Sequence, residues 1–350
     1  MRPVSAPDQA RWGSRARRRA VSVAAAAAGL ILAAGCHVPG FSSSAGGSPT
    51  ASGTVTVAAP PGVADAPLYI GIRDGLFSRA GLTVKVVPVT SVPQAVAALR
   101  NGSADVAFGD YASMFYAQEQ KAAPHLLTVA DGYDAGPNVM EVLTLPNSGI
   151  ASPSDLQGRT VGTAMAQGIP IMGKGGKSQP YSIDTLATWS VRTSDNVEVS
   201  KINWDPMQAS QLIRALQSGS VAAIVATEPV IYQAESQLGA VPVLDSCTGA
   251  TANLPLAGYF TTSSYQSQHA DVVAAFRAAL AKAQAEAIMA APLQTALTKS
   301  TRLKPQAAAL VTLGSYPTTL SAANLQRVVN LLFSFGSLPK TFNVSSMALK

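Results

Sequence analysis

The chain has 350 residues, 47% of them hydrophobic and 13% charged, which is enough for two lobes with separate cores and excludes an intrinsically disordered protein. Its formal net charge is +6, but six arginines against Asp8 place +5 of this before residue 36 and leave only +1 elsewhere. The rest of the chain therefore lacks the excess positive charge that binds the phosphates of a nucleic acid, and we expect no nucleic-acid partner.

The N-terminal residues have the pattern of an export signal. Arginines precede an apolar run over 20–35, which is shorter than the roughly 20 residues of a transmembrane helix. The stretch "LAAGC" resembles the lipobox of bacterial lipoproteins, with Ala33 where leucine is commonest. This resemblance implies a signal peptide over 1–35 and a diacylglyceryl anchor on Cys36, which would hold the exported protein on the outer face of the bacterial cell membrane. The secretory and twin-arginine routes both remain open.

A tether follows the lipidation site. Residues 36–53 are rich in Gly, Ser and Pro and show no apolar period, so we expect a flexible linker ahead of a globular body that begins near Thr54. Cys247 is the only other cysteine. Once Cys36 is lipidated, no intramolecular disulfide can form.

Strand and helix patterns then alternate along the chain. The first set predicts strands over 54–60, 82–89 and 104–109, and helices over 64–81 and 91–102. Such repeated units favour a mostly parallel sheet with helices on both faces.

A second set of alternating patterns follows a break. It predicts a helical turn over 152–158, strands over 159–165, 197–202 and 221–226, and helices over 183–193 and 205–219. A later strand over 254–263 precedes a region, 269–350, that reads as almost wholly helical. We therefore predict two α/β lobes, with lobe 2 (149–249) inserted into lobe 1 (54–148 and 250–350).

The two sets share an echoed segment. "ALRNGSADVAFGDY" (98–111) and "ALQSGSVAAIVATE" (215–228) both contain a helix end, a closing glycine, a short buried strand and then an acid. In open α/β sheets the ligand crevice lies outside the carboxyl ends of the strands. Each lobe should therefore supply one strand end to a cleft between the lobes, and the predicted ligand-binding residues there are Gly109, Asp110, Tyr111, Thr227 and Glu228.

The order of four segments carries a family resemblance: "PLYIGIRDGLFSRAGLTVKVVPV", "QAVAALRNGSADVAFGDY", "SPSDLQGRTVGT" and "QLIRALQSGSVAAIVATEP". As a series they are similar to the solute-binding proteins of ABC importers, in the group that binds nitrate, sulfonates, taurine and thiamine-precursor pyrimidines. The resemblance implies a two-lobed, type II-like periplasmic-binding-protein fold that closes on a small solute and delivers it to a permease and its ATPase. We expect a monomer with no cofactor and no metal.

Further site candidates have competing interpretations. Ligand contact is predicted for turns and strand ends of both lobes: Thr90, Ser91, Gln167, Gly168, Trp204 and Asp205. Asp110 and Glu228 could instead only cap the helices after them, because acids favour helix starts. Tyr111 could be a surface residue, and Trp204 is a candidate for core packing.

An enzymatic function is the alternative from another class. The three histidines are scattered, and the sequence contains neither C-x-x-C nor G-x-S-x-G, so we expect no enzyme. A small-molecule-processing enzyme or a sensor on the same bilobal fold remains the alternative. Neighbouring permease and ATPase genes would favour import.

Asp110 and Glu228 also bear on the charge of the ligand. If both carboxylates face a closed cleft, each would repel a small anion by roughly 2–4 kcal/mol at an effective dielectric near 20. We therefore predict a ligand that is neutral and hydrogen-bonding or that carries an amine, with Tyr111 packing against it.

Overall fold

The computed structural model describes residues 52–164, 170–172, 178–180, 183–194, 201–301 and 303–349. The chain divides into the units Met1–Gly47 and Ser48–Lys350, and all described residues belong to the second unit. Cys36 and most of its tether therefore lie outside the described residues. In the described part, no helix combines the length and the apolar character needed to cross a membrane.

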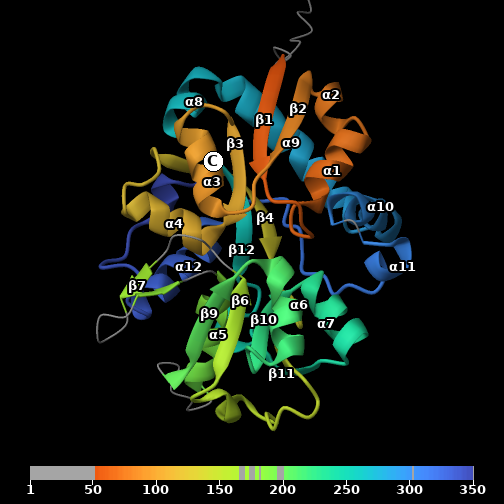
Figure 1. The fold of residues 1–350 in the computed structure, drawn as a ribbon. Helices are drawn as coiled ribbons and strands as arrows, with labels where there is room; N and C mark the ends of the chain where they lie inside the picture. Colours follow the sequence, from red (N-terminus) through yellow and green to blue (C-terminus); the bar gives the residue numbers. More distant parts are fainter. Residues whose placement is uncertain are drawn as a thin grey trace, which may run out of the picture. The chain divides into compact units, whose positions relative to one another are not determined.

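The first lobe is built on a five-stranded sheet of order β2-β1-β3-β12-β4 (Figure 1). Strand β12 pairs antiparallel with β3 and β4, while β2, β1 and β3 are parallel to one another. The strands are β1 (Gly53–Ala59), β2 (Leu82–Pro88), β3 (Val106–Asp110), β4 (Leu126–Asp134) and β12 (Pro255–Thr262).

The second lobe has a sheet of order β11-β5-β10-β6-β9, in which β5 is the strand that runs against its neighbours. Its strands are β5 (Met140–Thr144), β6 (Thr160–Ala164), β9 (Asn203–Met207), β10 (Ala223–Thr227) and β11 (Val241–Asp245). A separate two-stranded sheet joins β7 (Pro170–Met172) to β8 (Ser178–Pro180). The sequence therefore predicted the lobed, mostly parallel architecture correctly.

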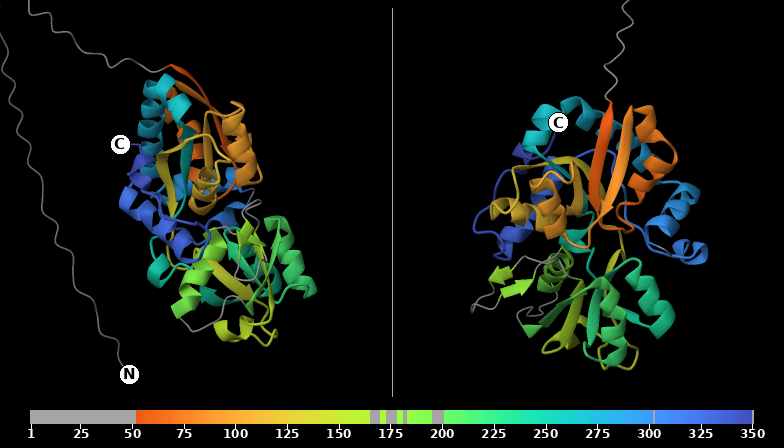
Figure 2. Two further views of the ribbon diagram at one scale, coloured as in Figure 1. Left: turned by 90° about the vertical axis from the view of Figure 1, so that its left-hand side faces the viewer. Right: turned by 45° about the horizontal axis from the view of Figure 1, so that its top comes forward.

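The two main sheets correspond strand by strand. Each contains one exchanged strand, β12 or β5, which comes along the chain directly after a strand of the other sheet. Strand β12 enters the first sheet after the chain has completed the second, and β5 enters the second sheet directly after the chain leaves the first. The lobes are thus joined by the connections between β4 and β5 and between β11 and β12 (Figure 2). Because β5 belongs to the second sheet, the predicted lobe boundary at 148 is wrong, and the chain changes lobe between Asp134 and Met140.

Helices pack against both sheets. In the first lobe, α3 and α4 contact β1, β3 and β12, whereas α9 contacts β2 and β4 together with α1 and α2. In the second lobe, α5, α6 and α7 pack on the central strand β10. The helices are α1 (Ala66–Arg73), α2 (Leu76–Arg79), α3 (Val92–Arg100), α4 (Tyr111–Glu119), α5 (Ile183–Ser194), α6 (Ala209–Ser218), α7 (Val230–Leu238), α8 (Ser263–Gln268), α9 (Ala270–Glu286), α10 (Ala290–Ser300), α11 (Pro305–Ala308) and α12 (Ala322–Ser334). Short 3-10 helices are η1 (Pro153–Leu156), η3 (Gly249–Thr251) and η4 (Val344–Ser346).

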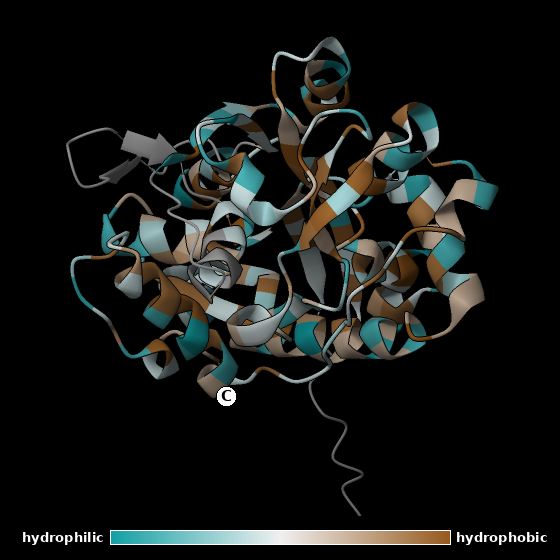
Figure 3. Ribbon diagram, turned by 90° about the horizontal axis from the view of Figure 1, so that it is seen from below, coloured by the Kyte–Doolittle hydropathy of each residue, from teal (hydrophilic) through white to brown (hydrophobic). Residues whose placement is uncertain are grey.

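Alternation along β10 shows how the second sheet is covered. Ala223 and Val225 belong to one buried cluster, and Ile224 and Ala226 belong to another. Because successive side chains of a strand point to opposite faces, both faces of this strand are buried. Viewed from the second lobe, hydrophobic residues gather on the inner strands and hydrophilic residues on the outer turns and loops (Figure 3).

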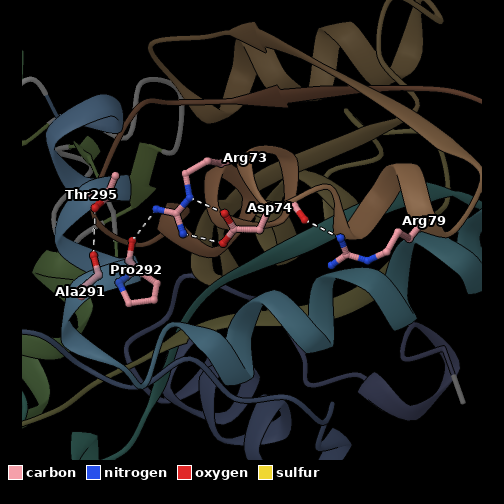
Figure 4. A network of polar contacts seen from close by, with 6 residues as sticks. All are labelled: Arg73, Asp74, Arg79, Ala291, Pro292 and Thr295. Carbon is pink, nitrogen blue, oxygen red and sulfur yellow. Dashed lines mark hydrogen bonds and ion pairs between the residues drawn. The ribbon is translucent and has the colours of Figure 1, made fainter.

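The C-terminal helices dock onto the first lobe near the end of α1. Arg73 pairs with Asp74 at 2.5 Å, and its Nη1 donates to the carbonyl of Pro292 in α10 at 3.1 Å (Figure 4). Arg79 donates to the Asp74 carbonyl at 2.7 Å. All of these polar contacts are solvent-exposed, so the apolar packing of α1 against α9 and α10 contributes most of the stability there.

Two element predictions differ from the structure. Most of the strand expected over 197–202 lies outside the described residues, and the strand that the structure shows after it is β9 at Asn203–Met207. Helix α6 begins only at Ala209, where Gln208 and Gln211 form a capping box. The C-terminal region is less helical than predicted, because residues 309–321 form an irregular connection and 335–343 lack a helix.

Candidate functional site

A cavity of about 300 Å³ lies between the two main sheets and is lined from both lobes. This is the cleft that the sequence predicted. The first lobe contributes 60–65, Phe108, Asp110, Tyr133, Leu256 and Ala257. The second lobe and the connection leading into it contribute Val139, Met140, Ile183, Asp184, Ala209 and 227–230.

Asp110 ends β3 and begins α4. Its Oδ1 accepts a hydrogen bond from the backbone N–H of Ser113 at 2.8 Å, which is an N-cap contact. Burial raises the pKa of Asp110, while hydrogen bonds from Ser113 and from the Ile183 backbone oppose the shift. Since Ile183 is the first residue of α5 in the second lobe, the carboxylate both caps its own helix and bonds across the cleft.

Glu228 follows β10 and has the corresponding position in the second lobe. Its Oε2 accepts from the Tyr232 N–H at 3.1 Å, and its Oε1 accepts from the Thr312 N–H at 2.9 Å. Burial raises the pKa of Glu228, and these two hydrogen bonds lower it. Glu228 therefore also bonds both within its helix and outside it.

The partner of Glu228 lies in a connection that is attached to the first lobe. Ser315 and Asp134 exchange backbone hydrogen bonds of 2.9 and 3.2 Å. The Gly314 N–H donates to the Tyr133 hydroxyl at 2.7 Å, and the Tyr316 hydroxyl donates to the Val63 carbonyl at 2.8 Å. Thr312 is thus held on the first lobe, so its bond to Glu228 crosses the cleft.

The alternatives of capping and cleft position both hold for the two acids. Asp110 and Glu228 make helix-start hydrogen bonds, and both line the cavity, as does Thr227. Gly109 lies beside the cavity but is not part of its lining. A Cβ atom there would come within 2.6 Å of Met114 Cε and 3.2 Å of Val92 Cγ2, so Gly109 is closely packed against side chains of α4 and α3.

Tyr111 points away from the cleft, into the core of the first lobe. Its side chain is fully buried, and its hydroxyl donates to Asp131 Oδ1 at 2.9 Å. The ring packs against Phe115 and Phe260, with centroid distances of 5.5 Å to each. The predictions that Tyr111 packs against solute, or lies on the surface, are therefore wrong, because as the first residue of α4 it is rotated toward β12.

Thr90 and Ser91 serve the start of α3. Ser91 is the N-cap residue and accepts from the Gln94 N–H, while the backbone and hydroxyl of Thr90 both donate to Gln94 Oε1 at 2.8 and 3.1 Å. Neither residue lines the cavity between the lobes. Their polar groups are used locally, which the sequence did not indicate.

Trp204 and Asp205 lie within β9 rather than at its end. They pair with Val161 and Gly162 of β6, at the edge of the second sheet. Trp204 is half-buried against the core, and Asp205 lines a different, open cavity of about 680 Å³ beside α6. The core-packing interpretation of Trp204 holds, and the predicted strand-end position at the cleft is wrong for both residues because β9 continues past them to Met207. Gln167 and Gly168 lie outside the described residues, as does Cys36.

Two further acids line the cavity and were not predicted. Asp184 lies in the first turn of α5, and Asp65 immediately precedes α1. Asp65 is completely buried; its Oδ1 accepts from the Gly62 N–H at 3.1 Å, and its Oδ2 has no hydrogen-bond partner among the described residues. An acid two positions before Pro67 was a signal for a helix start, but its side chain does not cap the helix.

The charge of the site is consequently one-sided. Four acids contribute to the described lining, and no lysine, arginine or histidine does. Within the described part of the chain, no group of three or more metal-ligating side chains has the geometry of a metal site.

Comparisons with known proteins agree with this architecture. The family described as "NMT1/THI5 like" matches residues 64–294. No curated protein sequence matches the chain significantly. Among solved structures, the alkanesulfonate-binding protein SsuA of Xanthomonas axonopodis pv. citri, bound to MOPS, has a TM-score of 0.66 at 18% identity, covering 85% of this chain and 98% of its own.

Two other structures show the range of proteins with this fold. The periplasmic nitrate-binding protein NrtA of Synechocystis PCC 6803 has a TM-score of 0.66 at 12% identity, covering 85% of this chain and 86% of its own. The desulfurization enzyme DSZB has a TM-score of 0.62 at 15% identity, covering 84% and 96%. At these identities the likeness shows a shared fold, that of periplasmic binding proteins, which can carry binding or catalysis.

Proposed function

Because the chain belongs to the NMT1/THI5-like family, we propose that it is the solute-binding subunit of an ABC importer. In this proposal it captures a small organic solute by closure of its two lobes and delivers the solute to a membrane permease. The observation that carries the proposal is the cavity lined from both lobes and bridged by one acid from each, Asp110 and Glu228. Hydrogen bonds across a cleft favour a closed state around its contents.

Solute binding without turnover agrees with the chemistry of the described lining. It contains no serine, cysteine or histidine, and two of its four acids, Asp110 and Glu228, already accept backbone hydrogen bonds. Solved structures with this fold include two named for solute binding and one named as an enzyme. Binding is therefore the function that this site supports best.

The test combines identification of the solute with a measurement of closure. Small molecules released from natively purified protein are identified by mass spectrometry and added back to the emptied protein. We expect small-angle scattering to show compaction on binding, and the molecule to be recovered unchanged. Release of a chemically altered product would refute the binding assignment.

We also propose that the protein is held on the outer face of the cell membrane by a lipid on Cys36. The support is the sequence "LAAGC" and the following tether. Replacing Cys36 with Ala should abolish incorporation of labelled fatty acid and release the protein from the membrane fraction. The matched control is Cys247→Ala, which removes the only other thiol. Membrane attachment that survives in Cys36→Ala would contradict the anchor.

A further inference from the structure

The charges around the cleft differ from those that would suit an anion. Asp65, Asp110, Asp184 and Glu228 line one cavity, and no basic residue accompanies them in its described lining. A wall of one charge sign in a partly desolvated space attracts ligands of the opposite sign and repels those of its own.

Helix N-termini are the usual alternative for holding an anion, because their first N–H groups lack partners within the helix. In three of the helices that start at the cleft, a carboxylate of the protein itself occupies one of these groups. The N–H groups of Ser113 in α4 and Tyr232 in α7 donate to Asp110 and Glu228, and the N–H of Ile183 in α5 bonds to Asp110. An anion held at these three N–H groups would have to displace the carboxylates.

The start of α1 offers no better anion site. The Ala66 N–H donates to the Val63 carbonyl at 3.2 Å, the Leu68 N–H donates to the Asp65 carbonyl at 3.0 Å, and Pro67 between them has no N–H. The first-turn donors of this helix are therefore used or missing.

Asp65 provides separate evidence for the class of ligand that the cleft binds. It lines the cavity with its side chain completely buried, and Oδ2 has no hydrogen-bond partner among the described residues. A carboxyl oxygen without a partner in such a place is costly. Burial raises the pKa of Asp65 well above its ordinary value, so ionising this carboxyl is costly while the cleft is empty. A cationic donor from a ligand would pair with Oδ2 and favour the ionised carboxylate, whereas an anion would disfavour that form further.

The rest of the wall suits a compact apolar body. Phe108 and Tyr133 contribute aromatic rings, and Met140 and Leu256 contribute aliphatic surface. Aromatic faces attract ammonium groups as well as apolar groups. A volume of about 300 Å³ is at the small end of the range for ligand sites, roughly 300–1,000 Å³.

We infer that the cleft binds a small organic cation, an amine on a compact apolar or aromatic body, with the carboxylate of Asp65 as its charge partner. This inference rests on the proposed function, since it names the class of solute that the two lobes would capture.

The experiment compares probes that share a body and differ in charge. Titration calorimetry measures benzylamine against benzyl alcohol and phenylmethanesulfonate, and butylamine against butanol and butanesulfonate. We expect at least one amine to bind on the order of tenfold or more tightly than its alcohol, and the sulfonates not to bind. If neither amine binds more tightly than its neutral counterpart, or if a sulfonate binds best, the inference is overturned.

Variants locate the charge partner. Asp65→Asn should weaken amine binding on the order of tenfold or more and leave alcohol binding unchanged. The matched control is Asp131→Asn, which removes a carboxyl that is also buried in the first lobe but does not line this cavity. If Asp65→Asn does not fold by circular dichroism, Asp184→Asn must show the same selective loss. Unchanged amine affinity in the folded variant contradicts the assignment.

The same measurements separate this inference from the proposed function. Compaction with a sulfonate, or release of an anionic molecule from purified protein, would leave solute capture intact and refute the cationic class. If no probe and no co-purified molecule compacts the protein, both fail.

Discussion

The β3–α4 and β10–α7 junctions place equivalent acids at the cleft by different local geometries. Asp110 is itself the N-cap of α4, and its short side chain reaches the third helical residue, Ser113. Glu228 stands two residues before α7, with Pro229 between, and needs its longer side chain to reach Tyr232. Both acids also bond across the cleft. The length of the side chain thus compensates for where the helix begins.

The two lobes differ more in what lies behind these junctions. In the first lobe, Tyr111 continues from Asp110 into an aromatic core with Phe115 and Phe260. In the second, the cluster under α6 and α7 contains only aliphatic side chains. Large buried rings and small aliphatic groups contribute unequally to stability, so equivalent substitutions should have unequal effects.

The largest effect is expected where a cross-lobe acid is removed. Glu228→Ala leaves the N–H groups of Thr312 and Tyr232 unpaired, and we expect a loss of about 2–4 kcal/mol in the free energy of unfolding. Asp110→Ala should cost about 1–3 kcal/mol through the lost cap and the lost bond to Ile183. Urea denaturation measures both, and scattering of the ligand-free protein should show a larger mean radius.

Glu235→Ala is the matched control for these variants. It removes the same charge from an exposed position on α7 and relieves the repulsion of Glu228 and Glu141 by that charge, so it should leave the radius unchanged and should not lower the stability. Equal effects of Glu228→Ala and Glu235→Ala would show that the cross-lobe bond is unimportant.

The second prediction concerns Tyr111, which we place in the core and not in the site. Tyr111→Phe removes the hydrogen bond to the buried Asp131 and should cost about 1–3 kcal/mol in unfolding free energy. Its affinity for the solute should stay within about twofold. Tyr133→Phe is the comparison, because Tyr133 lines the cavity and should change affinity as well. If Tyr111→Phe loses affinity for the solute without losing stability, Tyr111 belongs to the binding site after all.

The third prediction uses pH to examine the second lobe. Burial, followed by the charges of Glu235, Asp245 and Glu228, raises the pKa of Glu141 to about 7. Asp245 is its cross-strand neighbour on β11. Because the pKa of Glu141 is higher in the folded protein, its protonated form stabilises the fold. This contribution to the free energy of unfolding is fully present below about pH 4.5 and is lost as the pH rises through about 7.

Glu141→Gln is neutral at every pH, so it should be more stable than the wild type by about 1–3 kcal/mol at pH 8. The difference should disappear near pH 4. Thermal unfolding across this range provides the measurement, and parallel curves for the two proteins would be inconsistent with a raised pKa.

The smallest predicted effect is a loss of stability that should be equal at two corresponding glycines, one in each lobe. Gly102 and Gly219 follow the echoed helices with φ values of +73° and +72°, and a Cβ at either would meet no neighbouring atom. Gly102→Ala and Gly219→Ala should therefore each cost about 1 kcal/mol from backbone conformation alone. Markedly different losses in denaturation would mean that the two helix ends are not equivalent.

Local patterns were sufficient for the architecture but not for the site. Alternating apolar periods predicted the lobes, and the echoed segments correctly placed Asp110, Thr227 and Glu228 at the cleft. The partners Thr312 and Ile183 could not be predicted, because they are brought there by distant parts of the chain. Tyr111 was misplaced because a strand-end position does not determine the direction of the next side chain.

Asp65 shows the same limit of prediction from sequence, because it lines the cavity and was not predicted to do so. Its position before a helix is ordinary in sequence, and only the packing of the surrounding elements makes its Oδ2 a buried atom without a partner. The later start of α6 had a local cause, since Asp205 and Pro206 look like a helix start but lie in the strand.

The exchange of β5 and β12 has a consequence for biosynthesis. All five main strands of the second lobe lie between Met140 and Asp245, so a ribosome finishes that lobe as one continuous stretch. The first sheet stays open beside β3 until β12 emerges and Gly258 pairs with Gly109. Pairings over such sequence distances form slowly. We therefore expect the second lobe to be the part that can fold during translation, and the exposed edge of β3 to be the surface that a chaperone must shield.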